Sequence, residues 1–370
     1  MKQNSDFIDI ISLKRTKDPL SIKELQQLYY NNWLNENIRS LINSRLNDNE
    51  IKNKSVLLKP NWVKHSIAET DLYSLRTHDN VVLTTLEVIL DKQPSYVIIG
   101  DAPIQGAKWD LICTKEFSEK VKDLSNKYNI KVIIKDFRRR TFNVLENNKK
   151  ENLKSLSDYI IFDLAKDSYL EPITDDIKTR FRVTNYDPDR MQEAHSKGVH
   201  KYCITKDLFQ TDIIISIPKL KTHQKTGITG ALKNIVGING DKDFLPHHRL
   251  GGTKNGGDCY PGKSNLRYLA ELALDKANRR QGNKEYRFWQ KLSSLMWKLS
   301  FPGDLHQIAA GWHGNDTTWR MVLDLNKIAL YGKSDGTIAN EKQRVIYTLG
   351  DGIIGGQGNG PLEPLPLPLG

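Results

Sequence analysis

Short apolar runs alternate with amphipathic stretches along the first third of the chain. The runs have the length and residue types of buried strands, and the stretches between them repeat apolar residues at helical spacing. Strands are predicted at residues 55–59, 96–100 and 130–134, and helices at residues 81–90 and 114–128. Strand–helix–strand alternation of this kind predicts an α/β fold, with a mostly parallel sheet flanked by helices.

The same pattern continues over the rest of the chain, with one interruption. Further strands are predicted at residues 159–162, 212–216, 321–325, 328–331 and 344–349, and further helices at residues 264–280 and 284–299. The interruption is the stretch 241–262, which is rich in Gly, Pro, His, Asp and Lys and has little periodicity. A loop of this length inside a compact domain is usually functional or disordered.

The length of 370 residues exceeds what one compact domain usually needs. An amphipathic stretch at residues 21–47 predicts a helical segment within residues 1–50. We expect residues 51–370 to form the α/β region, as two interlocked lobes with a boundary near residues 165–210. The N-terminal helical segment is expected to pack over one face of this region.

The chain is basic, with 55 Lys and Arg residues against 44 Asp and Glu residues and a net charge of +11. This excess favours an anionic partner: nucleic acid, an acidic lipid surface, or a small molecule bearing phosphate or carboxylate groups. The basic run at residues 137–140 is interpreted as a solvated patch. Because the aromatic residues fall in predicted helical core stripes and not among the basic residues, the pattern argues against nucleic acid.

The cysteine pattern and the hydropathy of the chain indicate the cellular compartment of the protein. Cys113, Cys203 and Cys259 lie far apart and form no C-x-x-C pair, so neither a disulfide framework nor a cysteine-ligated zinc or iron–sulfur site is expected. The N-terminus lacks the features of a signal peptide, and no run of about 18 apolar residues occurs. We therefore expect a cytoplasmic protein without a membrane span.

Charged residues beside Pro or Gly follow four of the predicted strands. In open parallel sheets, ligands bind beyond the carboxyl ends of the strands. The polar residues at these ends are Lys59 with Asn61, Asp101, the series Lys219, Lys221 and His223, and Asp351. We expect them to meet in a cleft, where Asp101 and Asp351 would orient a divalent metal or a substrate hydroxyl. Alternatively, either carboxylate caps a turn.

The segment 218–237 holds four lysines and a histidine. Lys219, Lys221 and His223 alternate, so an extended segment would direct their side chains to one side. These side chains would complete an anion pocket; the alternative is that they are solvated, as lysines after a strand commonly are. No G-x-x-x-x-G-K-[ST] motif is present, so a P-loop nucleotide site is not supported.

Later in the same segment, the spacing of the residues changes from the alternation of a strand to that of a helix. Apolar residues take helical spacing over residues 228–236, and Gly237 stands in the usual terminating place. Polar residues of this stretch, Thr226, Lys233 and Asn234, lie on the opposite face. A basic loop followed by a glycine-bearing helix start favours an anion, because free N–H groups and the helix dipole attract negative charge.

Two histidines and a cysteine stand in the polar stretch 241–262. His247 and His248 could supply a proton donor or a metal ligand; the alternative is two exposed loop histidines. Metal spacing such as H-E-x-x-H is missing, so the sequence does not identify a metal. Cys259 is a candidate lone nucleophile, but no sequence feature names its base.

Motifs from about residue 55 to the end of the chain resemble those of one family. They are LLKPNWV (57–63), THDNVV (77–82), IIGDAPIQGA (98–107), NYDPDRM (185–191), HSKGVHKYCI (195–204), DIIISIPKLKTHQKTGITGALKNIVGINGDKDFLPHHR (212–249) and LGDGIIGGQGNGPLEP (349–364). Together they resemble the DUF362 family, and the block at 218–237 is quite specific. The resemblance implies little about the reaction, because the family is defined by sequence and is largely uncharacterised.

The resemblance sets further expectations. Some relatives carry a ferredoxin-like iron–sulfur segment whose cysteines this chain lacks, so no iron–sulfur cluster is expected. The stretch 311–326 resembles a subset of relatives from bacterial surface-polysaccharide gene neighbourhoods. The fold is similar to that of the nickel-pincer lactate racemase group, whose lysine and histidine ligands do not align here. Relatives continue past GNGPL with a further strand and helix, so we expect either that the C-terminal part is truncated or that the last lobe is unusually short.

Two functional hypotheses account for these features. The first is an enzyme acting on a small anionic substrate, such as a sugar or a phosphorylated or carboxylated metabolite, with a reaction class open among isomerase, lyase and hydrolase. The predicted substrate contacts are Lys59, Asn61, Lys219, Thr226, Lys233, Asn234 and Asp351, and the predicted catalytic residues are His223, His247, His248, Asp101 and Lys221. The second is a non-catalytic binder of nucleic acid or a polyanionic glycan. The sequence leaves cofactor and oligomeric state unknown.

Overall fold

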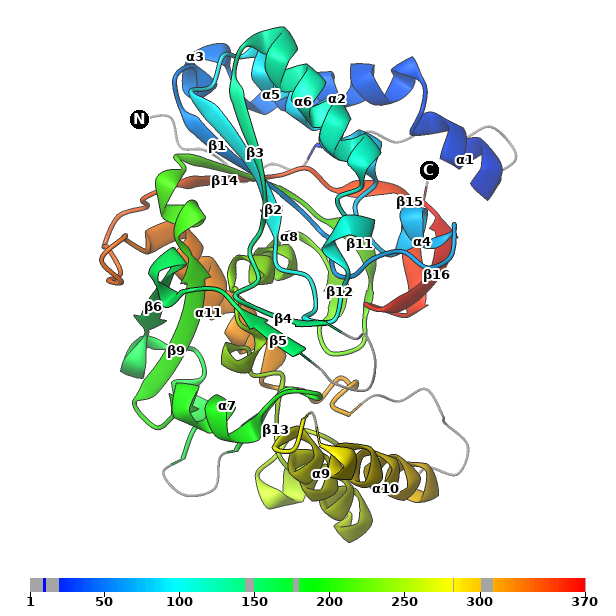
Figure 1. Ribbon diagram of the computed structural model, residues 1–370, viewed down its shortest axis with the longest axis vertical. Helices are drawn as coiled ribbons and strands as arrows, with labels where there is room; N and C mark the ends of the chain where they lie inside the picture. The colour runs from blue at the N-terminus through cyan, green and yellow to red at the C-terminus, as the bar shows by residue number, and fades with distance from the viewer. Residues whose placement is uncertain are drawn as a thin grey trace.

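A five-stranded parallel sheet forms the centre of the described part of the chain. The computed structural model describes residues 9–10, 20–143, 150–175, 180–281, 283–300 and 309–369. The sheet has the order β14-β10-β1-β2-β3, with β1 (Ser55–Pro60), β2 (Tyr96–Asp101), β3 (Lys131–Asp136), β10 (Ile213–Ile217) and β14 (Val345–Thr348). Neighbouring strands are parallel, so their carboxyl ends lie at one edge (Figure 1). The predicted α/β fold with a mostly parallel sheet flanked by helices is confirmed.

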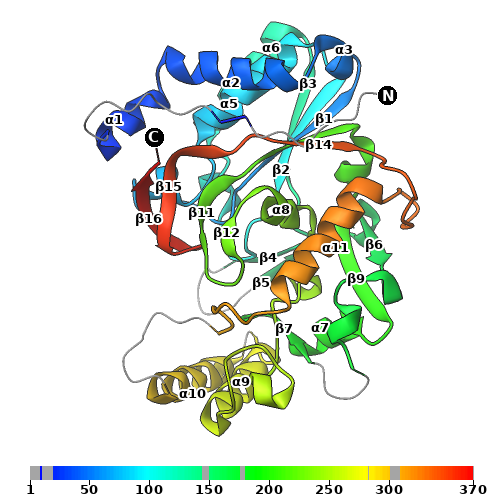
Figure 2. The same cartoon turned by 180° about the vertical axis from the view of Figure 1, so that it is seen from behind.

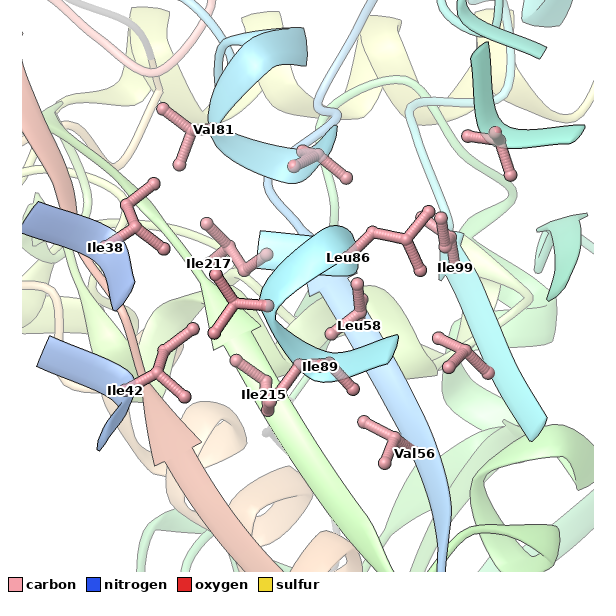
Figure 3. Close-up of a cluster of buried hydrophobic side chains, with 14 of the residues drawn as sticks. Ile38, Ile42, Val56, Leu58, Val81, Leu86, Ile89, Ile99, Ile215 and Ile217 are labelled. Carbon is pink, nitrogen blue, oxygen red and sulfur yellow. The ribbon is translucent and has the colours of Figure 1, made fainter. Parts of the chain in front are cut away.

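Helices from the first third of the chain cover one face of this sheet. They are α2 (Asn32–Arg45), α5 (Asp79–Asp91) and α6 (Lys115–Tyr128). Figure 3 shows Ile42 of α2 and Ile89 of α5 near Leu58 of β1 and Ile215 of β10. Side chains alternate along a strand, so every second strand residue joins this core. The short helix α1 (Ile22–Leu28) contributes Leu25 to the same core.

The opposite face packs on α11 (Thr318–Tyr331), which corrects one prediction. The strands predicted at residues 321–325 and 328–331 are wrong, because both ranges lie within this single helix. Met321, Leu325 and Ile328 are buried at spacings of four and three residues, as one face of a helix requires. Other apolar residues stand next to these three in the sequence, so the apolar run is nearly continuous. A continuous apolar run occurs both in buried strands and in buried helices, and its periodicity does not distinguish them.

A second sheet continues two strands of the first beyond their carboxyl ends. Its order is β12-β11-β15-β16, with β11 (Lys219–His223), β12 (Gly227–Thr229), β15 (Asp351–Asn359) and β16 (Glu363–Pro368). Only Pro218 separates β10 from β11, and two residues separate β14 from β15. The residues that follow two central strands therefore belong to strands themselves, which fixes the directions of their side chains.

Smaller elements complete the described fold. The helices are α3 (Asp48–Ile51), α4 (Asp71–Ser74), α7 (Pro188–Ala194), α8 (Ala231–Asn234), α9 (Asn265–Asn278) and α10 (Lys284–Ser300). The strands are β4 (Arg140–Asn143), β5 (Lys150–Leu153), β6 (Tyr159–Asp163), β7 (Phe181–Arg182), β8 (His195–Ser196), β9 (Val199–Thr205) and β13 (His248–Arg249). The pair α9–α10 lies at the end of the molecule away from α2 and α5 (Figure 1). Within the described residues, no helix is both long enough and apolar enough to cross a membrane.

Candidate functional site

Lys59 and Asp101 meet at the carboxyl ends of β1 and β2. Nζ of Lys59 lies 2.7 Å from Oδ1 of Asp101, and both side chains are buried. Asp101 also accepts hydrogen bonds from the backbone N–H groups of Trp62, at 2.6 Å, and Ala102, at 2.8 Å. Burial lowers the pKa of Lys59, and the carboxylate of Asp101 opposes this shift. Two neighbouring strand ends are thus joined by a hydrogen-bonded ion pair.

Asn234 of α8 ties this ion pair to β10. Its Nδ2 donates to the backbone O of Lys59 and to Oγ of Ser216, both at 2.9 Å. Nζ of Lys59 donates in turn to the backbone O of Pro60 at 2.8 Å and lies 3.4 Å from Oδ1 of Asn234. With Asp101, these partners use all three ammonium protons. Lys59 and Asn234 therefore hold the strand ends together, and their contact with a substrate stays a prediction.

The segment around α8 differs from the predicted helix at residues 228–236. Residues Gly227–Thr229 form β12, which pairs with β11, and α8 covers only Ala231–Asn234. Pairing with β11 removes Ile228 from the expected helical stripe, and its side chain is exposed. Figure 2 shows α8 between the β11–β12 hairpin and α11. The predicted helix is therefore wrong over residues 228–230, whereas the turns of α8 continue as a 3-10 helix over Ile235–Ile238. An α-helix of four residues offers little of the expected dipole.

The strand β11 places Lys219, Lys221 and His223 on one buried face, as their alternation predicts. The three side chains nevertheless have different partners. Nζ of Lys221 donates to two backbone carbonyl groups. Burial, with the neighbouring ammonium group of Lys233, lowers the pKa of Lys221 well below its ordinary value.

Lys219 and Asp351 form a second buried ion pair, at 2.9 Å. They stand opposite each other in the register of β11 and β15. The hydroxyl of Tyr29 donates to Asp351 at 2.8 Å and accepts from Lys219 at 3.0 Å, while the backbone N–H of His78 donates to Asp351 at 3.0 Å. This network joins the N-terminal helical segment to the C-terminal strand β15.

His223 and His247 hold complementary ring tautomers. Nδ1 of His223 accepts a hydrogen bond from the backbone N–H of Lys225 at 3.1 Å, so the proton of the neutral ring is on Nε2. Nδ1 of His247 lies 2.7 Å from the backbone O of Leu245. A carbonyl oxygen only accepts, so Nδ1 of His247 carries the proton and Nε2 keeps its lone pair. Burial, with the neighbouring lysines, lowers the pKa of both rings well below the ordinary value.

Three lysines accompany these histidines: Lys225, Lys233 and Lys242. Each is partly exposed but closely surrounded by protein. Burial, with the ammonium groups of Lys242 and Lys59, lowers the pKa of Lys233 to about 7. Burial also lowers the pKa of Lys225 and of Lys242 to about 8. Lys242 donates to a backbone carbonyl at 2.8 Å, whereas Nζ of Lys233 has no hydrogen-bond or ion-pair partner within the described ranges.

These five residues, His223, Lys225, Lys233, Lys242 and His247, are called the lysine–histidine cluster below. They interact electrostatically across β11, α8 and the stretch 241–262, and Lys233 also interacts with Lys59 and Asp101. The strand ends of β1 and β2 and the face of β11 thus meet at Lys233. Of the predicted residues, His223, His247 and Lys233 lie in this cluster.

Three other predicted residues have separate surroundings. The backbone N–H of Asn61 donates to Oγ1 of Thr77 at 2.8 Å. Oγ1 of Thr226, in the turn between β11 and β12, lies 3.3 Å from a backbone carbonyl of the same hairpin. Nε2 of His248 lies 3.4 Å from Oε1 of Glu271 of α9. The adjacent residues His247 and His248 therefore have different partners, and a substrate role for Asn61, Thr226 or His248 stays a prediction.

Sequence reasoning missed Lys225 and Lys242. The signal for Lys225 is its place two residues after His223 in a basic segment. Lys242 carries no such signal, because only the path of the stretch 241–262 brings it back to the strand ends. Tyr29 was also missed, since nothing in an amphipathic helix marks one tyrosine as the partner of a distant ion pair.

A family model described as a domain of unknown function (DUF362) matches residues 56–370. The chain belongs to the DUF362 family. A crystal structure of a Thermotoga maritima protein is similar to this DUF362 chain with a TM-score of 0.41 and 9% sequence identity, over 90% of this chain and 52% of that chain. The chain thus spans about half the length of the Thermotoga protein. No curated protein matches the sequence.

Proposed function

We propose that this DUF362 protein is an enzyme that transfers a proton on a small substrate bearing a phosphate or carboxylate group. The lysine–histidine cluster, at the carboxyl ends of the strands, would bind this substrate. The observation that carries the proposal is the crowding of cations there: Lys225, Lys233 and Lys242 accompany two histidines. The carboxylate of Asp101 is nearby but already paired with Lys59.

Crowded ammonium groups destabilise one another, and their burial adds a desolvation cost. Both effects act on Lys233, whose pKa is lowered to about 7. A bound phosphate or carboxylate would reduce the repulsion and would give Nζ of Lys233 the partner that it lacks within the described ranges. We therefore assign Lys233 to direct contact with the anion, with Lys225 and Lys242 contributing positive potential.

The two histidines supply the groups for proton transfer. Neutral His247 has its lone pair on Nε2, and a bound anion that offsets the neighbouring lysines would raise its lowered pKa and so let it accept a proton. Neutral His223 can donate a hydrogen bond from Nε2 to an oxygen on which charge develops. The lowered pKa of His223 is consistent with a neutral imidazole as the donor of this hydrogen bond. Lys221 and Asp101 would act by holding β11 and the strand ends in place. Isomerisation, elimination and hydrolysis all use such a proton transfer.

Burial of the basic residues favours a small ligand over a polymer. Lys219, Lys221 and His223 are directed into the fold and are almost fully buried, so a nucleic acid or polyanionic glycan could not contact them from the surface. A polymer would instead bind the exposed charges, and its affinity would fall steeply with salt.

Anion binding can be tested by thermal unfolding at constant ionic strength. We expect phosphate, pyrophosphate or malonate to raise Tm where chloride does not, because a ligand that binds the folded state stabilises it. Lys233→Ala should abolish the shift, whereas Lys122→Ala, at an exposed lysine of α6, should keep it. Equal shifts in the two variants, or none with any of these anions, would contradict the proposal. Tight DNA binding with a steep salt dependence would favour the polymer binder.

A further inference from the structure

We propose that His248, Cys259 and Glu271, which lie beside the lysine–histidine cluster but do not belong to it, form a binding site for a zinc-like divalent cation. These three residues are 3%, 3% and 4% exposed. A nitrogen of His248, Sγ of Cys259 and a carboxylate oxygen of Glu271 all lie within 4.8 Å of one another. An imidazole, a thiol and a carboxylate so close together in the interior are a set of metal ligands, and the proposed function makes no use of them.

Backbone hydrogen bonds fix the three residues from different elements. His248 belongs to β13 and pairs with Arg182 of β7. The N–H of Cys259 donates to the backbone O of Gly251 at 3.0 Å. Oε2 of Glu271, on α9, accepts from the N–H of Gly251 at 2.9 Å. The same loop residue thus orients both Cys259 and Glu271, as supporting hydrogen bonds do around metal ligands.

Two polar atoms of this group are buried without a hydrogen-bond partner in the described part of the chain. They are Nδ1 of His248 and Oε1 of Glu271. The distance of 3.4 Å between Nε2 of His248 and Oε1 of Glu271 brings the ring and the carboxylate together without a hydrogen bond. Leaving such atoms unpaired in the interior costs stability. A cation between the side chains would satisfy the carboxylate oxygen and an imidazole nitrogen together.

The donor types match zinc. Zn²⁺ accepts His nitrogen, Cys sulfur and carboxylate oxygen, and its bond lengths place tetrahedral ligands roughly 3.3–3.8 Å apart. His248 and Glu271, 3.4 Å apart, already lie within this range, and no pair of ligand atoms would have to close by more than about 1–1.5 Å on binding. Three protein ligands leave a fourth position for water or another ligand, as in catalytic zinc sites. Lys225 and Arg182 lie near and oppose a cation. Arg182 is already paired with Asp275, and Cys259 as thiolate and Glu271 would bring two negative charges to the cation itself.

A cysteine nucleophile is the other chemistry that these residues could support. It would need the thiol to donate to His248 and to ionise readily. Instead, Nδ1 of His248 has no hydrogen-bond partner in the described part of the chain, and burial together with the carboxylate of Glu271 raises the pKa of Cys259 well above its ordinary value. A thiol that resists ionisation is a poor nucleophile, whereas a metal ion displaces its proton on binding.

The site can be tested on the full chain after removal of metal with a chelator. Titration with Co²⁺ should produce a thiolate-to-cobalt charge-transfer band, and mass spectrometry of zinc-loaded protein should find one tightly held zinc per chain. We expect Cys259→Ser to lose the band and to weaken zinc binding at least about tenfold. The control is Cys113→Ser, at a half-buried cysteine paired with Ser118, which should keep both.

Because Cys259→Ser could unfold the protein, the spectrum of the wild-type protein decides independently. A cobalt complex without a charge-transfer band, or no bound metal, would overturn the proposal. A band that persists in folded Cys259→Ser would also overturn it, because the thiolate would then come from another cysteine. Anion-induced changes in Tm test the lysine–histidine cluster separately, so either idea can fail alone.

Discussion

The backbone of Gly237 lies directly against the carboxylate of Asp101. A Cβ on Gly237 would fall 1.8 Å from Oδ1 of Asp101 and 2.7 Å from Nζ of Lys59, so no side chain fits here while the ion pair is intact. We expect Gly237→Ala to force the buried pair apart. Separating such a pair costs about 3 kcal/mol or more, because each charge loses its partner in the interior. Chemical denaturation would show this loss in the free energy of unfolding.

Gly230→Ala is the matched control. Nothing lies within 4 Å of a Cβ at Gly230, and its backbone is in an extended conformation that any residue adopts. This variant should change the free energy of unfolding by less than about 1 kcal/mol. Similar losses in the two variants would show that the contact between Gly237 and Asp101 is not what requires glycine.

The role of Gly237 shows what could and could not be predicted from the sequence. The apolar runs predicted the central sheet because buried parallel strands need continuous apolar residues. The strand pattern also indicated that Lys59 and Asp101 stand at the carboxyl ends of two strands of one sheet. Whether these charges face a ligand or each other depends on distances of an ångström, which no spacing along the chain expresses. Gly237 was therefore interpreted as a helix terminator, although it is needed for a close approach.

Long-range pairing and helix length were the other limits. Tyr29 and Asp351 are 322 residues apart and become partners only through packing of the N-terminal segment beside β15. The helix α11 was predicted as two strands, because its buried apolar side chains adjoin one another along the run. In both cases the local sequence pattern allowed more than one structure, and the tertiary environment determined which one forms.

Tyr29→Phe tests the network around Lys219 and Asp351. The variant removes the hydroxyl that donates to Asp351 at 2.8 Å and accepts from Lys219 at 3.0 Å, while the ring keeps its stacking on His78. We expect the free energy of unfolding to fall by about 1–3 kcal/mol, since two buried charges each lose a hydrogen bond. The comparison is Tyr169→Phe, at a half-exposed tyrosine, which should be nearly neutral. Equal stabilities of the two variants would contradict a structural role for this network.

The burial of His195 predicts that the protein loses stability in mild acid. Burial, with the neighbouring ring of His200, lowers the pKa of His195 to about 3 from an ordinary value of 6.5. The folded state therefore keeps His195 neutral while the unfolded chain takes up a proton below pH 6.5. This contribution is complete above pH 6.5 and is lost as pH falls toward 3, at about 1.4 kcal/mol per pH unit for one proton.

Denaturation of His195→Asn at pH 7, 6 and 5 would check this slope. Without the ring, the free energy of unfolding should fall less steeply as pH falls, and the slope should be smaller by the contribution of about one proton. His313→Asn, at an exposed histidine, should retain the slope of the wild-type protein. An unchanged slope in His195→Asn would mean that other groups produce the acid sensitivity.

Lys233 should be an unusually reactive amine. Burial and the nearby ammonium groups lower its pKa to about 7, so at pH 7.5 most of it is neutral, against about 0.1% of an ordinary lysine. Only the neutral amine reacts with an acylating reagent, so labelling of Lys233, followed by mass spectrometry in a buffer without phosphate, should be half-maximal near pH 7. Partial burial can slow the reaction but does not move this midpoint.

Phosphate should shift the midpoint upward, because a bound anion stabilises the ammonium form. Exposed Lys122 supplies the comparison: a midpoint for Lys233 as high as that of Lys122, or one that ignores phosphate, would show that Lys233 neither feels the crowded charges nor meets the anion.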